Sequence, residues 1–182
     1  MSAHQSPKNT PDFESRLPPP EAREAALYEK LSALGITWKT HAHGPVFTVE
    51  EARSLKGVLP GTHTKNLFLK DKKDGLFLVS TREDVRVDLN ALARLLNRPR
   101  FSFGAPELLL ETLRIAPGAV TPFSLMNDRD ARVRAVFDAG MLVHDSINFH
   151  PLRNDRTTAI SASDLMRFAR DTHHELLVLA LP

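Results

Sequence analysis

Lys65 stands at the start of an alternating apolar run, residues 65–69 (KNLFL), shortly after a turn at Pro60-Gly61. Because residues i and i+2 of a strand share one face, Lys65 lies on the same face as Leu67 and Leu69. One of the two faces must pack, so the strand carries a charged amine to the edge of a core or cleft. An amine placed there can hold an ester or a phosphate of a substrate, although a lysine at the start of a strand often only extends to water.

The loop from Pro117 to Pro122 has a composition that can stabilise an anionic oxygen. Gly118 lets the backbone adopt a positive φ or approach a ligand closely, and the second proline stiffens the loop. Successive N–H groups of such a loop can point at one oxygen, as an oxyanion hole requires. A plain connector between a helix and a strand also contains proline and glycine, so the loop alone leaves both interpretations open.

His150 is the third candidate, because the proline that follows it favours an extended backbone at the histidine. Such a histidine can orient a water or hold a neighbouring loop. His41 and His43 are close enough to share a strand face, and two more histidines are adjacent at 173–174. Neither pair has a carboxylate or a third histidine at ligand spacing, so we predict surface or hinge histidines and no metal site.

The composition excludes several other chemistries. The chain has no cysteine, which removes disulfides, thiolate metal sites and a cysteine nucleophile. It also lacks the phosphate-loop, dinucleotide, zinc-protease and serine-hydrolase motifs. Of its 182 residues 42% are hydrophobic and 25% charged, as expected for one globular domain, and a net charge of +2 permits a local basic patch. With no apolar run near the roughly 20 residues of a membrane span and no signal-peptide pattern, we expect a cytoplasmic protein.

The elements that must position these residues are a mixture of helices and strands. Periodicity and capping patterns predict helices over residues 21–34, 49–55, 89–96 and 106–113, and one more that starts at Ser161 or Ser163. Strands are predicted over 36–40, from Lys65 to a hairpin turn at 72–75, and over 76–79, 133–137, 141–143, 147–149, 157–160 and 176–179. Asp88 is expected to cap the helix whose inward face carries Leu89, Leu92, Leu95 and Leu96.

We therefore predict an α+β, or mixed α/β, single domain with a curled sheet over residues 21–182. Residues 1–20 contain five of the thirteen prolines and little apolar periodicity, which predicts a flexible proline-rich tail.

Taken together, three motifs resemble the YbaK/ProX family of prolyl-tRNA editing domains. They are residues 64–69 (TKNLFL), the Gly118-x-x-x-Pro122 loop and residues 149–152 (FHPL), and the first is most similar to the freestanding alanyl-tRNA(Pro) deacylase branch. Each motif is weak singly, but their order and spacing make the match specific. The resemblance extends over about residues 22–181 and implies a barrel-like mixed sheet wrapped by helices.

The resemblance implies a hydrolase that removes alanine, and also serine or cysteine, from mischarged tRNA(Pro). An aminoacyl ester is already activated, so neither a cofactor nor a covalent nucleophile is required. Lys65 would hold the substrate, backbone N–H groups around Gly118 would stabilise the oxyanion, and His150 would orient a water. The predicted substrate-binding residues are Asn66, Ala119, Val120 and Pro122.

The implied partners are mischarged tRNA(Pro) and prolyl-tRNA synthetase, with no membrane and no metal. Lys70, Arg82 and Arg94 are the predicted tRNA-binding residues, although a solvated charged surface would look the same. Two alternatives remain open: a non-catalytic tRNA- or synthetase-binding module of the same fold, and a hydrolase of simple amino-acid esters.

Overall fold

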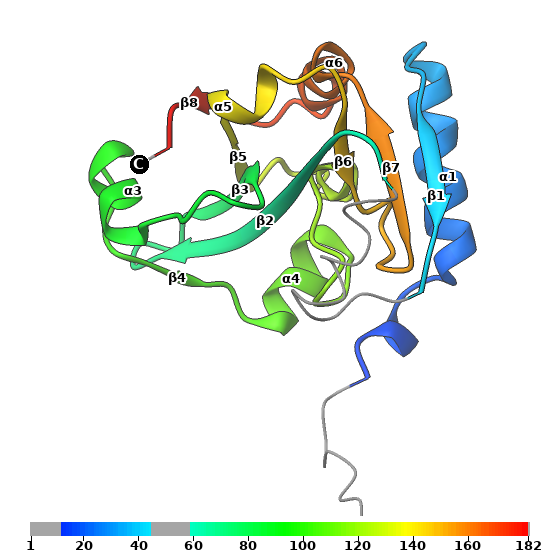
Figure 1. The fold of residues 1–182 in the computed structure, drawn as a ribbon. Helices are drawn as coiled ribbons and strands as arrows, with labels where there is room; N and C mark the ends of the chain where they lie inside the picture. The colour runs from blue at the N-terminus through cyan, green and yellow to red at the C-terminus, as the bar shows by residue number, and fades with distance from the viewer. Residues whose placement is uncertain (1–11, 45–58, 182) are drawn as a thin grey trace, which may run out of the picture.

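The computed structural model describes residues 12–44 and 59–181 (Figure 1). Its α-helices are α1 (Pro20–Ala33), α3 (Leu89–Leu95), α4 (Pro106–Leu113), α5 (Ala139–Leu142) and α6 (Ala162–Asp171), and its 3-10 helices are η1 (Glu14–Arg16) and η2 (Pro122–Asn127). Its strands are β1 (Lys39–Ala42), β2 (Thr62–Asp71), β3 (Leu76–Arg82), β4 (Phe101–Phe103), β5 (Val133–Asp138), β6 (Ile147–Phe149), β7 (Arg156–Ile160) and β8 (Leu176–Leu179). No helix in the described ranges is long and apolar enough to cross a membrane.

One mixed sheet joins the strands of the described residues. Its order is β1-β7-β6-β2-β3-β5-β8, and β4 pairs with β2 beside this path. The pairs β2–β6, β3–β5 and β5–β8 are parallel and the others are antiparallel. Figure 1 shows β2 as the long central strand, with α1 and β1 at one side of the molecule and α3 at the other. This mixed sheet with helices around it confirms the predicted fold class.

The alternation along β2 divides its side chains between two cores. Phe68 packs into the larger core, which also contains side chains from α1, α4, η2 and α6, whereas Leu69 packs into a smaller core with residues of α3 and β4. The next strand, β3, is buried from Leu76 to Thr81. Its unbroken apolar start is what a strand covered on both faces requires.

Several predicted elements are confirmed by their capping groups. The Asp88 carboxylate accepts hydrogen bonds from the N–H groups of Asn90 and Ala91 at the start of α3, and Ser161 accepts from Asp164 at the start of α6. After α1, Gly35 adopts a φ of 64°, a conformation that glycine tolerates and that ends the helix. The 72–75 turn also joins β2 to β3 as predicted.

Other predictions were wrong. Residues 139–142 form α5, not a strand over 141–143, because Asp138 caps the Gly140 N–H and starts a helical turn. Leu95 is 49% exposed, so it does not face inward. The first strand begins at Lys39, since Ile36 instead packs into the larger core. Strand β4 was not predicted. The predicted helix over 49–55 lies outside the described residues.

Residues 12–20, which fall in the predicted tail, contact the domain. Phe13 is 7% exposed and packs against Leu110 of α4 and Ala116, and Glu14 forms an ion pair with Arg23 of α1. The short helix η1 is thereby fixed beside α4.

Candidate active site

Asn66 joins β2 to the Gly118 loop. Its Nδ2 atom donates a hydrogen bond to the carbonyl oxygen of Val120 at 3.1 Å. Its Oδ1 atom is buried without a hydrogen-bond partner among the described residues, and is therefore an acceptor that a ligand or water can use. Asn66 lies on the face of β2 that also carries Phe68, so the loop covers this face of the strand.

Lys65 lies next to this contact but on the other face of an alternating strand. Opposite it on β3 is Thr81. The side chain is partly buried, and within the described part of the chain its amine has no hydrogen bond or ion pair. The amine is therefore available to a ligand. Its long stem allows it to reach around the edge of the strand.

The Gly118 loop has an exposed apex and anchored ends. Gly118 adopts a φ of 88°, a value that side chains disfavour, so the glycine is needed for the shape of the loop. The Ala119 N–H already donates to the Ala116 carbonyl at 3.2 Å, whereas no described residue accepts from the N–H of Gly118 or Val120. These two N–H groups are therefore the candidate donors for the predicted oxyanion.

The buried side chains around the loop hold its shape. Ala119 is 1% exposed and Pro122 is buried where η2 begins, while Val120 is partly buried. Ala119 and Pro122 therefore anchor the loop, and their predicted contact with substrate stays a prediction.

His150 follows β6, which runs parallel to the start of β2. His63 is paired with Asn148, and the Thr64 hydroxyl donates to the Asn148 carbonyl at 2.7 Å. His150 lies two residues beyond Asn148, just past the end of β6. The structure thus brings Lys65, the Gly118 loop and His150 to neighbouring segments, although they are far apart in the sequence.

The His150 ring has a defined hydrogen-bonding state. Its Nδ1 atom lies 3.0 Å from the Arg156 carbonyl oxygen, which can only accept, so Nδ1 carries the proton. Burial lowers the pKa of His150, and the nearby His43, 6.5 Å away between ring centroids, lowers it further. The ring is therefore neutral at pH 7, and its Nε2 atom presents a lone pair.

The turn after His150 is fastened to α1 by Arg153. This side chain donates to Asp155 from Nε at 2.5 Å and from Nη2 at 2.6 Å, and its Nη1 donates to Glu24 at 3.1 Å. Leu152 within the turn has a φ of 63°, a strained value that these contacts maintain. Arg153 was not predicted, because its contact with Glu24 of α1 forms only when the chain folds.

The predicted tRNA-binding residues do not form one cluster. Arg82 lies opposite Thr64 at the Lys65 end of β2 and pairs with Asp84 at 3.3 Å. Lys70 is five residues further along β2, roughly 17 Å at the rise of a strand, and pairs with Asp74. Arg94 is exposed on α3.

The described residues hold no group of three or more histidine, aspartate or glutamate side chains that could bind a metal. His43 Nε2 lies 2.9 Å from the Thr157 hydroxyl. His174 is not a surface histidine as predicted, because it is buried with its Nε2 atom 3.1 Å from Asp128.

Comparison with known proteins identifies the family. Residues 43–168 match the model of the aminoacyl-tRNA editing domain. The chain therefore belongs to this family.

Relatives with curated names agree with this assignment. The chain is 41% identical over 156 residues to the prolyl-tRNA synthetase associated domain-containing protein 1 of Danio rerio, with 85% of each chain covered. It is 32% identical to the prolyl-tRNA editing protein ProX of Acetoanaerobium sticklandii, over 82% of this chain and 92% of that protein. A crystal structure described as a candidate trans-editing enzyme for prolyl tRNA synthetase shares the fold, with a TM-score of 0.68 and 20% identity over 90% of this chain and 98% of that chain.

Proposed function

We propose that the protein is a trans-editing aminoacyl-tRNA deacylase that hydrolyses the ester of mischarged tRNA(Pro), with alanine as the preferred acyl group. The observation that carries this proposal is the hydrogen bond from Asn66 to the Val120 carbonyl, which fixes the glycine loop against the strand of Lys65. Membership of the editing-domain family and the similarity to ProX support it. The protein would act in the cytoplasm beside prolyl-tRNA synthetase.

The reaction needs a positioned water and a stabilised oxyanion. Water attacks the ester carbonyl carbon, the carbonyl oxygen becomes an oxyanion, and collapse of this intermediate breaks the bond to the ribose oxygen. The N–H groups of Gly118 and Val120 would donate to the oxyanion. The neutral Nε2 atom of His150 would orient the water, and either Nε2 or a ribose hydroxyl would accept its proton and return it to the departing ribose oxygen. Alanine and free tRNA are released.

Lys65 would act as a cationic donor to the substrate. An ordinary lysine has a pKa near roughly 10.4, so it is protonated at neutral pH and suited to a phosphate or a carbonyl oxygen. Asn66 would contribute its unpartnered Oδ1 atom to the α-amino group or to a ribose hydroxyl of the substrate. Both side chains would bind the substrate, and neither would form a covalent intermediate.

Selectivity would follow from size. A synthetase pocket built for proline rejects the smaller alanine weakly, because one lost apolar group is worth only about 1–3 kcal/mol. A second pocket that is too small for proline but admits alanine gives a stronger distinction. We expect the partly buried Val120 side chain to limit that space.

The test is deacylation of labelled Ala-tRNA(Pro) by the wild type, by Lys65→Ala and by Lys39→Ala as a matched control on the exposed start of β1. We expect the wild type and the control to release alanine, and Lys65→Ala to be slower by about a hundredfold, the scale of loss for one donor to the reacting group. Background-level release by all three proteins would refute the proposal and leave the non-catalytic binding module.

Two further substrates separate the remaining alternatives. A panel of alanine, serine, cysteine and proline on tRNA(Pro) should show alanine cleaved fastest and proline spared. An alanine ester without tRNA should turn over slowly; equal turnover of the two alanine substrates would identify a hydrolase of simple esters.

A further inference from the structure

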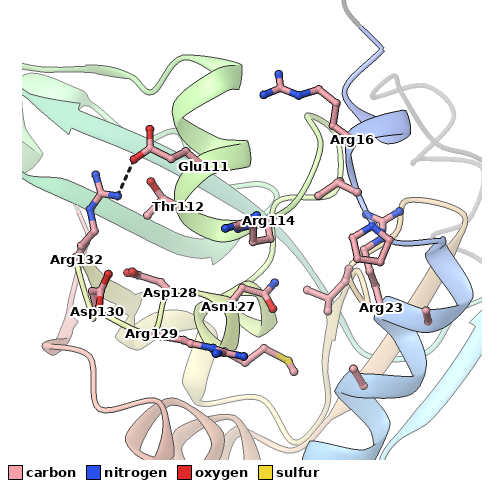
Figure 2. A pocket seen from close by; sticks show the side chains of 16 residues that line it. Arg16, Arg23, Glu111, Thr112, Arg114, Asn127, Asp128, Arg129, Asp130 and Arg132 are labelled. Atoms are coloured by element: carbon pink, nitrogen blue, oxygen red, sulfur yellow. Dashed lines mark hydrogen bonds and ion pairs between the residues drawn. The ribbon is translucent and has the colours of Figure 1, made fainter.

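A pocket of about 710 Å³ has a lining that does not include Lys65 (Figure 2). Its walls come from η1, α1, the end of α4 and the end of η2, together with Leu152. Arginines are prominent among its lining residues: Arg16, Arg23, Arg114, Arg129 and Arg132. The proposed deacylation uses none of them.

The charges in this pocket are unevenly distributed. Figure 2 shows Arg132 at one end with Glu111, Asp128 and Asp130, and the other four arginines along the centre and the opposite end. Arg132 pairs with Glu111 at 2.9 Å. The Asp128 carboxylate accepts from the Val133 N–H and faces His174. The acids at this end are therefore largely occupied.

The other end has more positive charge than its neighbours neutralise. Arg16, Arg114 and Arg129 are exposed, and their side chains form no ion pair or hydrogen bond with any described residue. Arg23 is different, because its side chain is only 5% exposed and one nitrogen pairs with Glu14 at 2.5 Å. Its Nε and Nη1 atoms are buried and have no partner among the described residues.

A buried guanidinium group with unpartnered nitrogens, as in Arg23, points to an anionic ligand. A buried donor without an acceptor costs about 1–3 kcal/mol, and more when it is charged, so such a group normally has a partner in the working protein. The guanidinium fork matches the oxygens of a phosphate, and several arginines around one hollow are typical of phosphate recognition. The hydroxyl of Thr112, also buried and unpartnered, adds a further donor on the same wall.

Two lining residues of the pocket lie close in the chain to two of the three segments of the candidate active site. Arg114 precedes Gly118 by four residues, at most about 14 Å along an extended chain, and Leu152 follows His150 by two residues. A phosphate in the pocket would therefore lie within a few nucleotides of an ester bound beside the Gly118 loop. In addition, Arg16 and Arg23 precede the residues 43–168 that match the family model, so this chain builds the pocket partly from its own N-terminal segment.

We propose that this arginine pocket binds phosphate groups of the RNA backbone, and that it holds the acceptor arm of the tRNA while the terminal ester occupies the editing site. This assignment rests on the proposed function for the identity of the RNA. The phosphate chemistry itself rests on the arginines alone.

Charge reversal at the exposed arginines tests the proposal. Arg16→Glu and Arg129→Glu are each compared with Arg170→Glu, which changes the net charge equally at an exposed position of α6 outside the pocket. Binding of uncharged tRNA(Pro) is measured by fluorescence anisotropy over a range of salt concentrations. We expect each pocket variant to bind about tenfold more weakly than the control, with the slope of log affinity against log salt reduced by about 1. Affinities and slopes equal to those of Arg170→Glu would overturn the proposal.

Two more measurements identify the source of the phosphate and separate the two proposals. If pyrophosphate binds the wild type but not the variants while tRNA affinity is unchanged, the pocket serves a small phosphate compound and the RNA assignment is wrong. With Ala-tRNA(Pro), the pocket variants should show a raised KM. A wild type that binds tRNA through these arginines but releases no alanine would refute the deacylase and support the pocket. If the wild type deacylates Ala-tRNA(Pro) normally and the pocket variants bind tRNA as well as the control does, the deacylase proposal is supported and the pocket proposal is refuted.

Discussion

Asn66 and Val120 are 54 residues apart in the sequence, yet a single hydrogen bond of 3.1 Å joins the amide of one to the carbonyl oxygen of the other. This contact fixes the loop backbone whose neighbouring N–H groups are the proposed oxyanion donors. The candidate active site therefore depends on this hydrogen bond between β2 and the Gly118 loop, in addition to the residues that would contact the substrate.

Replacing Asn66 by alanine should loosen the loop. The Val120 carbonyl would lose its partner, and we expect the free energy of unfolding to fall by about 1–2 kcal/mol, the cost of leaving such a group unpaired. Hydrogen exchange at residues 118–121 should become faster. As a control, Asn90→Ala removes an exposed asparagine side chain on α3 and should leave this exchange unchanged. Unchanged hydrogen exchange at these residues in Asn66→Ala would show that the Asn66–Val120 hydrogen bond does not hold the loop.

Gly118→Ala should change the backbone conformation of the Gly118 loop. At a φ of 88° an alanine is strained by about 1–2 kcal/mol, so the backbone should move and misdirect its N–H groups. We expect deacylation of Ala-tRNA(Pro) to slow by at least about tenfold. Gly140→Ala is the matched control, because this glycine is helical and an added Cβ would meet only Asp138 at 3.5 Å, an ordinary contact. Equal activity of the two variants would contradict the role of Gly118.

Arg153 should be needed to hold the turn after His150. Its side chain is 8% exposed, and its removal would leave Asp155 and Glu24 without their main partner. Breaking a buried ion pair costs about 3–5 kcal/mol, and since these carboxylates are partly exposed we expect Arg153→Met to lose about 2 kcal/mol in urea unfolding. Arg132→Ala breaks an exposed pair with Glu111 and should cost less than about 1 kcal/mol. Similar losses in both variants would argue against a specific role for Arg153.

The local elements could be predicted from the sequence because their signals are local. Alternation identified β2 and its hairpin, Asp88 marked the start of α3, and the start of α6 was placed at Ser161 or Ser163, of which Ser161 is the cap. The prediction failed where tertiary contacts decide. Leu95 matches an apolar helical face, but the small core beneath α3 is filled by Leu92 and its neighbours.

The candidate site could be predicted only in part. Lys65, Gly118 and His150 are distinctive in their local sequence, whereas the Asn66–Val120 hydrogen bond depends on how β2 and the loop pack. The arginine pocket has no sequence signal either, because its residues come from four elements and only folding shows which of them lack acidic partners. Pairing and burial are properties of the folded chain.

The pH dependence of deacylation tests the state of His150. Burial lowers the pKa of this histidine below its ordinary value of 6.5, and His43 lowers it further. A role for the neutral ring therefore predicts that kcat/KM falls on the acid side with a midpoint below 6.5, where Nε2 takes up a proton. Stability should change in the same direction: the unfolded chain binds this proton first, so the free energy of unfolding falls as the pH drops below about 6.5. The His150→Gln variant should lose both the acid limb and this part of the stability loss. A kcat/KM that rises as the pH falls through 6.5 would assign the active form to the protonated ring and overturn this role.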